Sequence, residues 1–563
     1  MSFLKTAIAF LIIMFTYASN AVTTALPAFV PEPKTETELM AMEDTIKDYP
    51  LNEEITVIRQ SKLTTAQLRT VISLQGIVAK TKPSIYIDNS SSTSEYNLNE
   101  LAEAGYTISC TDADGNEWTF STLTEKFASY VTDKGYVLYS KTDDHGQINT
   151  ATNYSTMFGW LAVPAEVEET VKSLGFEKKE DISNDVIDID YLKNFYNKYK
   201  DSFRKDILVH QYSYTHGLRD LAIQQNAFVV YVDDSDWVGR VFRNRVFRDL
   251  ESGSMILGWC QYEGKFTQMI SMFGHYVIPS DHSYNMSILS SFEAHNGIMK
   301  NKETKTPELD PTKHYITIMY SDGDNAQWIQ NGFQEFHTWQ SYNSELPITW
   351  SFQPHLRQMS SVDIKRTLEG VSGNDSFVTG PSGAGYGRIS YMKNSDLKTF
   401  SDQTASAMLK TGITTVTVLD EIKTKSDINK IASKLRYFAR YDNIHGGILQ
   451  LEPDRYSEGK GEVLFVNEKP FVSVKLSLWH PSGNADEVTK EWLKEQADTV
   501  NSYSADINSI NGYSVINVHP WTVGPDDLAY FTSCLDEDVV VISGDEMIQA
   551  ITENVPHKNA IPQ

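Results

Sequence analysis

The sequence predicts an α/β protein in which a C-terminal (β/α) barrel follows small α/β domains. Three observations predict this class. Apolar, β-branched runs recur about every 32 residues in the C-terminal part of the chain, close to the length of a βαβ unit. Segments with helical periodicity separate most of these runs. The chain before them alternates shorter helix-like and strand-like stretches.

The N-terminus is typical of a secretory signal peptide. Lys5 precedes an apolar run over 6–18, and Ser19 and Ala21 form a small-x-small cleavage pattern. This run is too short to cross a membrane comfortably, and no later stretch approaches the roughly 18 apolar residues that a span needs. We therefore expect a secreted or extracytoplasmic protein, periplasmic or extracellular, with no membrane insertion once residues 1–21 are removed.

Residues 22–185 are expected to form an N-terminal α/β domain. Within it, the periodicity predicts a helix over 65–78 and a strand over 136–139. The charged stretch 177–190 is the expected linker. Residues 186–250 then predict a small α/β segment that bridges to the barrel.

Residues 251–563 are expected to form the barrel. Near-continuous apolar strands between amphipathic helices indicate a parallel sheet covered by helices, and eight such units favour a closed barrel. Helices are indicated over 426–438 and 525–535, where one face is apolar and Asp or Pro stands in the first turn. The eight apolar runs begin near Tyr315, Ile348, Ser376, Ile413, Gly446, Phe471, Tyr513 and Val539.

The number of barrel strands has alternatives. The runs 255–259 and 275–278 are candidates for earlier barrel strands. Residues 463–465 and 471–478 can instead form a hairpin around 467–469. A regular eight-stranded barrel and an irregular seven-stranded barrel are therefore both consistent with the pattern.

The charge balance bears on the partners. The chain carries 74 acidic and 49 basic residues, a formal net charge of −25. Phosphate backbones repel such a chain, so nucleic acid is not an expected partner.

Carboxylates, imidazoles and large aromatic side chains follow the predicted barrel strands. In a parallel barrel the loops at the carboxyl ends of the strands converge around one mouth, where the chemistry takes place. The residues expected there include Asp322, Asp324, His355, Tyr386, Asp420, Glu421, Glu452, Trp479, His519 and Trp521.

Several segments, in order along the chain, carry the motifs of one known family. They are INTATNYSTMFG over 148–159, 217–232, YITIMYSDGDNAQW over 315–328, GPSGAGYGRI over 380–389, 469–479 and GYSVINVHPW over 512–521. With these segments the chain resembles the GxGYxYP family, whose members are described as putative glycoside hydrolases. The resemblance implies an N-terminal α/β region, a barrel-like domain, and breakdown of a polysaccharide or oligosaccharide.

One departure from the family motif concerns the site. The second Tyr and the Pro of GxGYxYP are replaced by Arg388 and Ile389, whereas Gly383, Gly385 and Tyr386 are retained. If the replaced pair lines the site, activity or specificity differs from that of the family.

Glycoside hydrolysis requires one carboxyl group to protonate the leaving oxygen and a second to act as base or nucleophile, about 5 Å away for retention or about 6.5 to 9.5 Å for inversion. We expect Asp322 or Asp324 to pair with Glu421 or Glu452. A structural interpretation competes with this one. Asp322 and Asp324 can cap the helix that follows, and acids such as Glu421 are common at helix starts.

Other side chains at the strand ends are expected to bind substrate. Aromatic rings match the apolar faces of sugars, although each Trp can equally belong to the core. Imidazoles and charged groups can contact hydroxyls, although most single His residues are structural. The expected substrate-binding residues are Asp420, His355, Tyr386, Arg388, Trp479, His519 and Trp521.

Three functions remain open. The first is an exported glycoside hydrolase with two carboxylates at the barrel mouth and no cofactor. The second, suggested by Arg388 and Ile389, is a carbohydrate-binding protein without activity. The third, suggested by Ser321-Asp322-Gly323-Asp324, is a metal-dependent hydrolase or deacetylase, but no His-x-x-x-His pair occurs in the chain and we predict no metal ligands.

Overall fold

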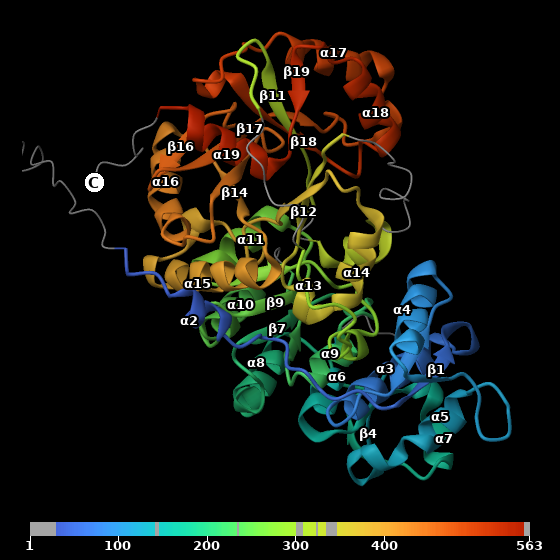
Figure 1. The fold of residues 1–563 in the computed structure, drawn as a ribbon. Coiled ribbons are helices and arrows are strands. Elements are labelled where there is room, and N and C mark those ends of the chain that lie inside the picture. Colours follow the sequence, from blue (N-terminus) through green and yellow to red (C-terminus); the bar gives the residue numbers. More distant parts are fainter. Residues whose placement is uncertain are drawn as a thin grey trace, which may run out of the picture.

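The structure is a computed structural model of the whole chain. It describes residues 30–140, 146–233, 236–299, 308–322, 325–333 and 346–556. The expected signal peptide and Asp324 lie outside these residues. The barrel occupies one end of the molecule (yellow-green to red in Figure 1), two small N-terminal sheets occupy the other, and a third sheet with β7 and β9 lies between them.

The first unit is a parallel sheet with the order β2-β1-β3. Its longest helix, α3 (Thr65–Ala79), begins at a capping box in which Thr64 and Gln67 satisfy each other's backbone N–H groups. This confirms the helix predicted over 65–78. The other elements are β1 (Glu54–Arg59), β2 (Ile85–Asp88), α4 (Ser92–Glu103), β3 (Thr107–Ser109) and α5 (Phe120–Lys126).

The second unit is another three-stranded parallel sheet, with the order β5-β4-β6. Its edge strand β6 (Glu177–Asp181) lies where the charge run predicted the linker to begin. Charged residues suit an edge strand because they discourage pairing with another chain, so charge alone did not separate edge from linker. The remaining elements are β4 (Gly135–Tyr139), α6 (Gln147–Phe158), β5 (Leu161–Pro164) and α7 (Glu168–Ser173).

The third unit is a four-stranded parallel sheet with the order β10-β9-β7-β8. The runs at 255–259 and 275–278, candidates for barrel strands, pair here instead. A buried parallel strand has the same pattern in either sheet, so the sequence could not separate the two. The elements are α8 (Ile189–Tyr199), β7 (Ile207–His210), α9 (Arg219–Gln224), β8 (Phe228–Val230), α10 (Trp237–Arg248), β9 (Met255–Gly258), α11 (Glu263–Met272), β10 (Tyr276–Ile278) and α12 (Met286–Leu289).

The C-terminal domain is an irregular seven-stranded barrel, one of the two predicted forms. Its strands follow one another around the ring in chain order, and β18 pairs with β11. They are β11 (His314–Tyr320), β12 (Thr349–Phe352), β13 (Ser376–Thr379), β14 (Thr415–Glu421), β15 (Gly446–Glu452), β17 (Lys469–Leu478) and β18 (Tyr513–Val518).

Side chains close the barrel between β13 and β14. The backbone N–H of Thr417 donates to Oγ1 of Thr379 at 2.9 Å, and the N–H of Leu419 donates to Oγ of Ser382 at 3.0 Å. These hydroxyls replace the ladder that joins the other neighbours in the ring.

The eighth predicted strand is present but lies outside the ring. β19 (Val539–Val541) pairs with the first half of β11, and β12 pairs with its last two residues, both on the edge away from β18. The predicted hairpin is confirmed, since β16 (Val463–Val466) pairs antiparallel with β17. The barrel has seven strands and not eight because β19, the last of the eight predicted runs, pairs beside the ring.

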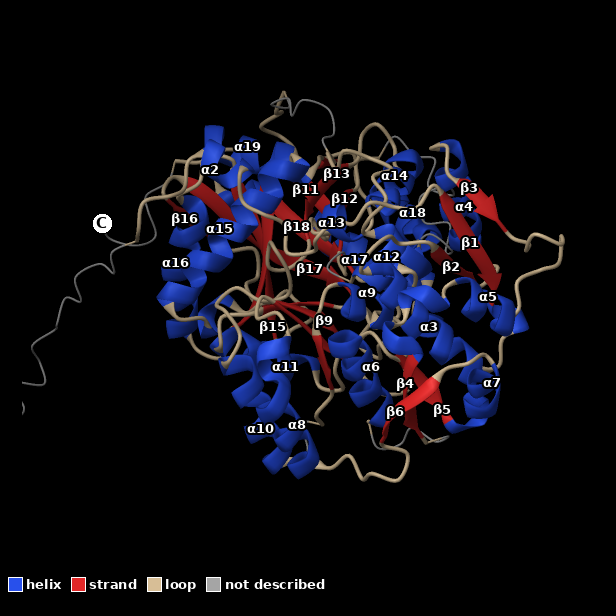
Figure 2. Ribbon diagram, turned by 90° about the horizontal axis from the view of Figure 1, so that it is seen from below, coloured by secondary structure: helices blue, strands red, loops and turns tan. Residues whose placement is uncertain are grey.

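Helices cover the outside of the barrel. α18 begins at Pro525 as predicted, and α19 begins at a capping box of Ser543 and Glu546. Figure 2 shows α15, α16 and β16 on the side opposite α5 and α7. The helices are α13 (Leu356–Met359), α14 (Ser361–Gly370), α15 (Asn394–Thr411), α16 (Lys425–Ala439), α17 (Lys490–Asn501), α18 (Pro525–Ser533) and α19 (Gly544–Asn554). None of the helices in the described ranges is long and apolar enough to cross a membrane.

Residues 30–51 connect the barrel to the third sheet. Helix α2 (Glu36–Met40) packs on α15, and the backbone of Leu39 accepts a hydrogen bond from Ser406. Beyond it, Asp44 forms ion pairs with Arg357 and Lys410 of the barrel. The next residues, Thr45 and Lys47, bond to Arg204 and Gln225 beside the third sheet.

Candidate active site

A cavity of about 450 Å³ opens at the carboxyl ends of the barrel strands. The carboxyl ends of β9 and β10 border the same cavity, so two sheets of the chain enclose it. The barrel contributes Asp322, Asn325, Pro381, Tyr386, Leu419, Gln450, Glu452, Tyr456, Trp479, His519 and Trp521. The third unit contributes Trp259, Glu263, Gly264 and Pro279. The volume is in the range of small-molecule sites.

Asp322 follows β11 with a left-handed backbone conformation, φ +64°. Asp tolerates this region better than most residues. The indole N–H of Trp521 donates a hydrogen bond to Oδ2 of Asp322, and Nε2 of His519 lies 4.0 Å from the same oxygen. Burial raises the pKa of Asp322 to about 7; the Trp521 bond opposes this rise and the charge of Glu263 adds to it. Near neutral pH this carboxyl group can hold or release a proton.

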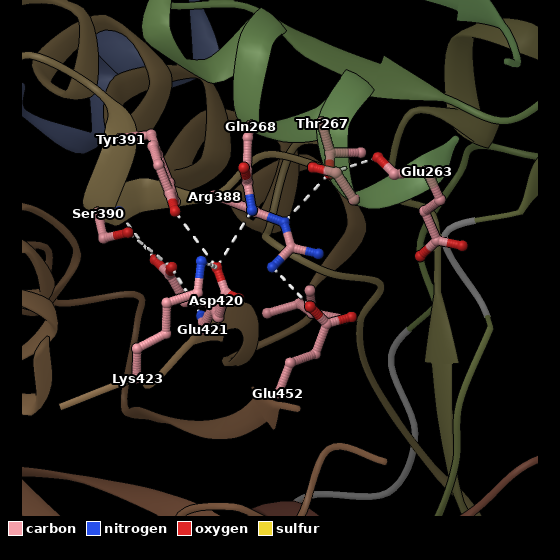
Figure 3. Close-up of polar contacts among 12 residues, drawn as sticks. Glu263, Thr267, Gln268, Arg388, Ser390, Tyr391, Asp420, Glu421, Lys423 and Glu452 are labelled. Carbon is pink, nitrogen blue, oxygen red and sulfur yellow. Dashed lines mark hydrogen bonds and ion pairs between the residues drawn. The ribbon is translucent and has the colours of Figure 1, made fainter. Parts of the chain in front are cut away.

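Glu452 ends β15 and is held by a buried cation. Nη1 of Arg388 lies 2.7 Å from Oε2 of Glu452, and Nε of Arg388 donates to Oγ1 of Thr267 at 3.1 Å. The guanidinium is fully buried, whereas 30% of the Glu452 side chain is exposed. Figure 3 shows Arg388 between Thr267 of α11 and Glu452. The ion pair places a buried positive charge directly beside Glu452.

Glu263 begins α11 and reaches the cavity from the third unit. The phenol of Tyr386 donates to its Oε1 at 2.5 Å. The pKa of Glu263 lies above its usual value, because burial, the largest effect, and the charge of Glu452 raise it, while the Tyr386 bond and Arg388 offset only part of this rise. Glu263 is an exposed residue that lines the cavity. Among the described residues, the cavity is thus lined by three carboxyl groups, Asp322, Glu263 and Glu452.

Aromatic rings form much of the wall. Trp479 and the imidazole of His519 are stacked, with centroids 3.8 Å apart and planes 1° apart. Tyr456 packs edge-on against Trp479 at 5.4 Å, and Trp259 stacks on Tyr386 at 6.0 Å. Trp521 is 49% exposed. Flat apolar surfaces beside carboxyl groups suit sugar rings, whose faces are apolar and whose edges carry hydroxyls.

The retained glycines of the GxGYxYP motif position Tyr386. A Cβ on Gly385 would lie 2.3 Å from the ring of Tyr276, and Gly383 has φ +88°. The close approach lets the backbone of Tyr386 form an antiparallel bridge with Val277, the middle residue of β10, with N···O distances of 2.8 and 3.1 Å. The motif loop therefore joins the barrel to the third sheet.

Six of the residues predicted for the site are brought together around this cavity. Asp322, Tyr386, Glu452, Trp479, His519 and Trp521 line it. Arg388 lies directly behind Glu452 and is not a lining residue. Ile389 is fully buried. The departure from the family motif thus supplies a counter-ion to Glu452 and removes no carboxyl group from the cavity.

Three other predicted residues lie elsewhere, and a fourth is not described. Glu421 contacts Gln268, Tyr391 and Lys423 outside the lining of the cavity, as Figure 3 shows. Asp420 is buried and accepts hydrogen bonds from the N–H and hydroxyl of Ser390, so it anchors the motif loop. His355 stacks on Tyr276 at 5.7 Å, away from the cavity. Asp324 lies outside the described residues.

Sequence reasoning missed Trp259, Glu263 and Tyr456. Trp259 ends the run 255–259 and Glu263 follows it, and the pattern predicts this run only as an early barrel strand. A search for acids after every predicted strand would have included Glu263. Tyr456 follows Glu452 on a loop whose course the sequence does not predict. Among the described residues, no group of three or more His, Cys, Asp or Glu side chains is suited to a metal ion.

An enclosed carboxylate cavity at a barrel mouth is the arrangement of many hydrolytic enzymes. Four family models match successive parts of the chain: the GxGYxYP first domain over 54–128, the second over 134–203, the third over 205–291, and the "GxGYxYP putative glycoside hydrolase C-terminal domain" over 312–552. The chain therefore belongs to the GxGYxYP family.

A solved structure shares the fold. The crystal structure of a "putative hydrolase" from Bacteroides thetaiotaomicron matches with a TM-score of 0.78 and 23% sequence identity, covering 92% of this chain and 99% of that one. At this identity the similarity concerns the fold. A search of curated proteins finds no match.

Proposed function

We propose that this protein hydrolyses glycosidic bonds, with Asp322 as the general acid and Glu452 as the base or nucleophile. The observation that carries the proposal is the presence of two differently surrounded carboxyl groups in one cavity. Asp322, whose pKa is raised to about 7, holds a proton near neutral pH, whereas Glu452 is paired with the buried guanidinium of Arg388 at 2.7 Å. Glycoside hydrolysis requires such a pair.

The residues then act in a defined order. Asp322 donates its proton to the glycosidic oxygen as the bond to the anomeric carbon breaks, so the leaving sugar departs as an alcohol. Glu452 either attacks the anomeric carbon or removes a proton from the water that attacks it. In the first case Asp322, now ionised, takes the proton from the water that hydrolyses the intermediate; in the second, it is reprotonated from solvent.

The aromatic wall supports a carbohydrate as the substrate. The stacked pair of Trp479 and His519 and the exposed ring of Trp521 offer apolar surfaces beside the two carboxyl groups. Such surfaces bind the C–H faces of sugars and leave the hydroxyls free to reach polar groups. We further propose export of the mature chain after removal of residues 1–21, which N-terminal sequencing of the secreted protein tests.

The first test separates hydrolysis from binding. Wild type and Asp322→Asn are assayed against polysaccharides and oligosaccharides by product mass spectrometry, and binding is measured by calorimetry. We expect the variant to lose hydrolysis and to retain binding. Binding without hydrolysis by the wild type would favour the inactive carbohydrate-binding protein, and activity lost on treatment with a chelator would favour a metal-dependent hydrolase.

A further inference from the structure

In the part of the chain that the structure describes, Glu263 is the carboxylate of the cavity that the proposed acid and base pair does not use. It stands in the first turn of α11, where an acid also favours the helix dipole. That local interpretation does not account for its contacts. Its side chain lies in the cavity with Asp322 and Glu452 and accepts the Tyr386 phenol at 2.5 Å.

Tyr386 holds Glu263 in one place. The Tyr386 backbone is bridged to Val277, its ring stacks against Trp259 at 6.0 Å, and only 3% of the residue is exposed. Burial, followed by the charge of Glu263, raises the pKa of Tyr386 well above its usual value. The phenol therefore keeps its proton across the working pH range and always donates to Glu263. This bond favours the ionised form of Glu263 and opposes burial, which is the larger effect and raises the pKa of Glu263.

The other charged and titratable groups around Asp322 do not cancel the influence of the Glu263 charge on it. Among the described residues, Asp322 faces the neutral indole of Trp521, the imidazole of His519 and Glu263. Burial lowers the pKa of His519 to about 4, so it is uncharged near neutrality. On its other sides Glu263 faces Tyr386, Glu452 and Arg388, and the Arg388 guanidinium is paired with Glu452.

We propose that Glu263 is a positioning residue for proton transfer: its charge, fixed by the phenol of Tyr386, keeps the proton on Asp322. The transfer of that proton to a glycosidic oxygen rests on the proposed function. The electrostatic coupling between Glu263 and Asp322 does not. The third unit thus supplies part of the barrel's site. Tyr386, the retained Tyr of the GxGYxYP motif, holds Glu263 in position.

The Trp521 indole proton reports this coupling without any substrate. Because the indole N–H donates to Asp322, its NMR resonance follows the protonation of that carboxyl group. The full-length mature protein is labelled with 15N-tryptophan, and the Trp521 resonance among the ten tryptophans is assigned with Trp521→Phe. We expect a titration midpoint near pH 7 in the wild type.

Glu263→Gln should lower this midpoint by at least about 0.5 pH unit, because a like charge nearby raises a carboxyl pKa. Tyr386→Phe should lower it too, because Glu263 then loses the bond that fixes it and favours its charge. Glu421→Gln, a carboxylate removed at a neighbouring strand end outside the cavity lining, should leave the midpoint unchanged. Circular dichroism verifies that each variant is folded.

A resonance that titrates with the same midpoint in wild type, Glu263→Gln and Tyr386→Phe would overturn the inference, as would a wild-type resonance that does not titrate between pH 4 and 9. Failure of the proposed function is a different result: Asp322→Asn would retain hydrolysis whatever the midpoints are. If hydrolysis is present, the upper pH limb of kcat/KM should move with the midpoint in Glu263→Gln.

Discussion

The burial that raises the pKa of Asp322, and so suits it to act as an acid, also lowers the stability of the folded protein. Its pKa is raised from 3.8 to about 7, chiefly by burial, so the folded state binds more protons than the unfolded state between these values. Stability is therefore lost as the pH rises through this window. An amide at this position has no charge to bury.

Asp322→Asn should consequently stabilise the protein at pH 8. The gain is about 2 to 4 kcal/mol, from about 1.4 kcal/mol for each pKa unit, and it should disappear near pH 4. Urea denaturation of both proteins at the two pH values measures it. Equal stability of the two proteins at pH 8 would show that Asp322 ionises in the folded protein without this cost.

The sequence predicted two alternative residues for each of the two carboxyl groups, Asp322 or Asp324 and Glu421 or Glu452. Of these, Asp322 and Glu452 line the cavity. Asp322 and Glu452 could be found because both end an apolar run in the barrel. Glu421 ends such a run as well, but its side chain contacts Gln268 and Tyr391 instead of lining the cavity. Strand periodicity locates the end of a strand, whereas the direction of the last side chain depends on packing between units.

Among the elements, the junction of β13 and β14 determines whether the barrel closes. No backbone ladder joins these strands, and Oγ1 of Thr379 accepts the N–H of Thr417 at 2.9 Å in the buried interior. A methyl group in place of the hydroxyl keeps the shape and leaves that N–H without this acceptor.

Thr379→Val should therefore destabilise the protein by about 1 to 3 kcal/mol, the cost of a buried donor without a partner. Thr499→Val is the matched control, because the Thr499 hydroxyl bonds only to the carbonyl of Glu495 on an exposed face of α17. Thermal unfolding of both variants measures the two losses of stability. If the control loses as much stability as Thr379→Val, the Thr379 hydroxyl contributes no more than an exposed hydroxyl does.

Most elements could be predicted from the sequence, but their assignment to sheets could not. All eight apolar runs of the C-terminal part are strands, and α3 and α18 begin close to their expected residues. The strands β9 and β19 have the same apolar pattern as barrel strands. Yet β9 joins the third sheet, and β19 pairs with β11 outside the ring. Local pattern gives the existence of a buried strand, whereas its neighbours depend on contacts distant in sequence.

At the scale of the whole molecule, the segment 30–51 ties the barrel to the third sheet, which together enclose the cavity. Asp44 forms ion pairs with Arg357 and Lys410, the latter at 3.1 Å. Burial alone would raise the pKa of Asp44, but these two cations outweigh burial and lower it. The pairs thus contribute stability above the unfolded pKa, and this contribution is lost as the pH falls through the folded pKa.

Asp44→Asn should cost about 1 kcal/mol at pH 7, since the carboxyl group is partly exposed, and close to nothing at pH 2. Denaturation of wild type and variant across this pH range measures the difference. A cost that stays constant down to pH 2 would show that the contacts act through packing and not through charge.

The most direct test of the central claim compares leaving groups. If Asp322 is the general acid, Asp322→Asn should lower kcat/KM by about 10² to 10⁴ for glycans, whose leaving alcohols need a proton. It should lower kcat/KM far less for 2,4-dinitrophenyl glycosides, whose leaving group departs without one, and Glu421→Gln should change neither. Equal losses on both substrate classes, or no loss on either, would contradict the assignment of Asp322 as the acid.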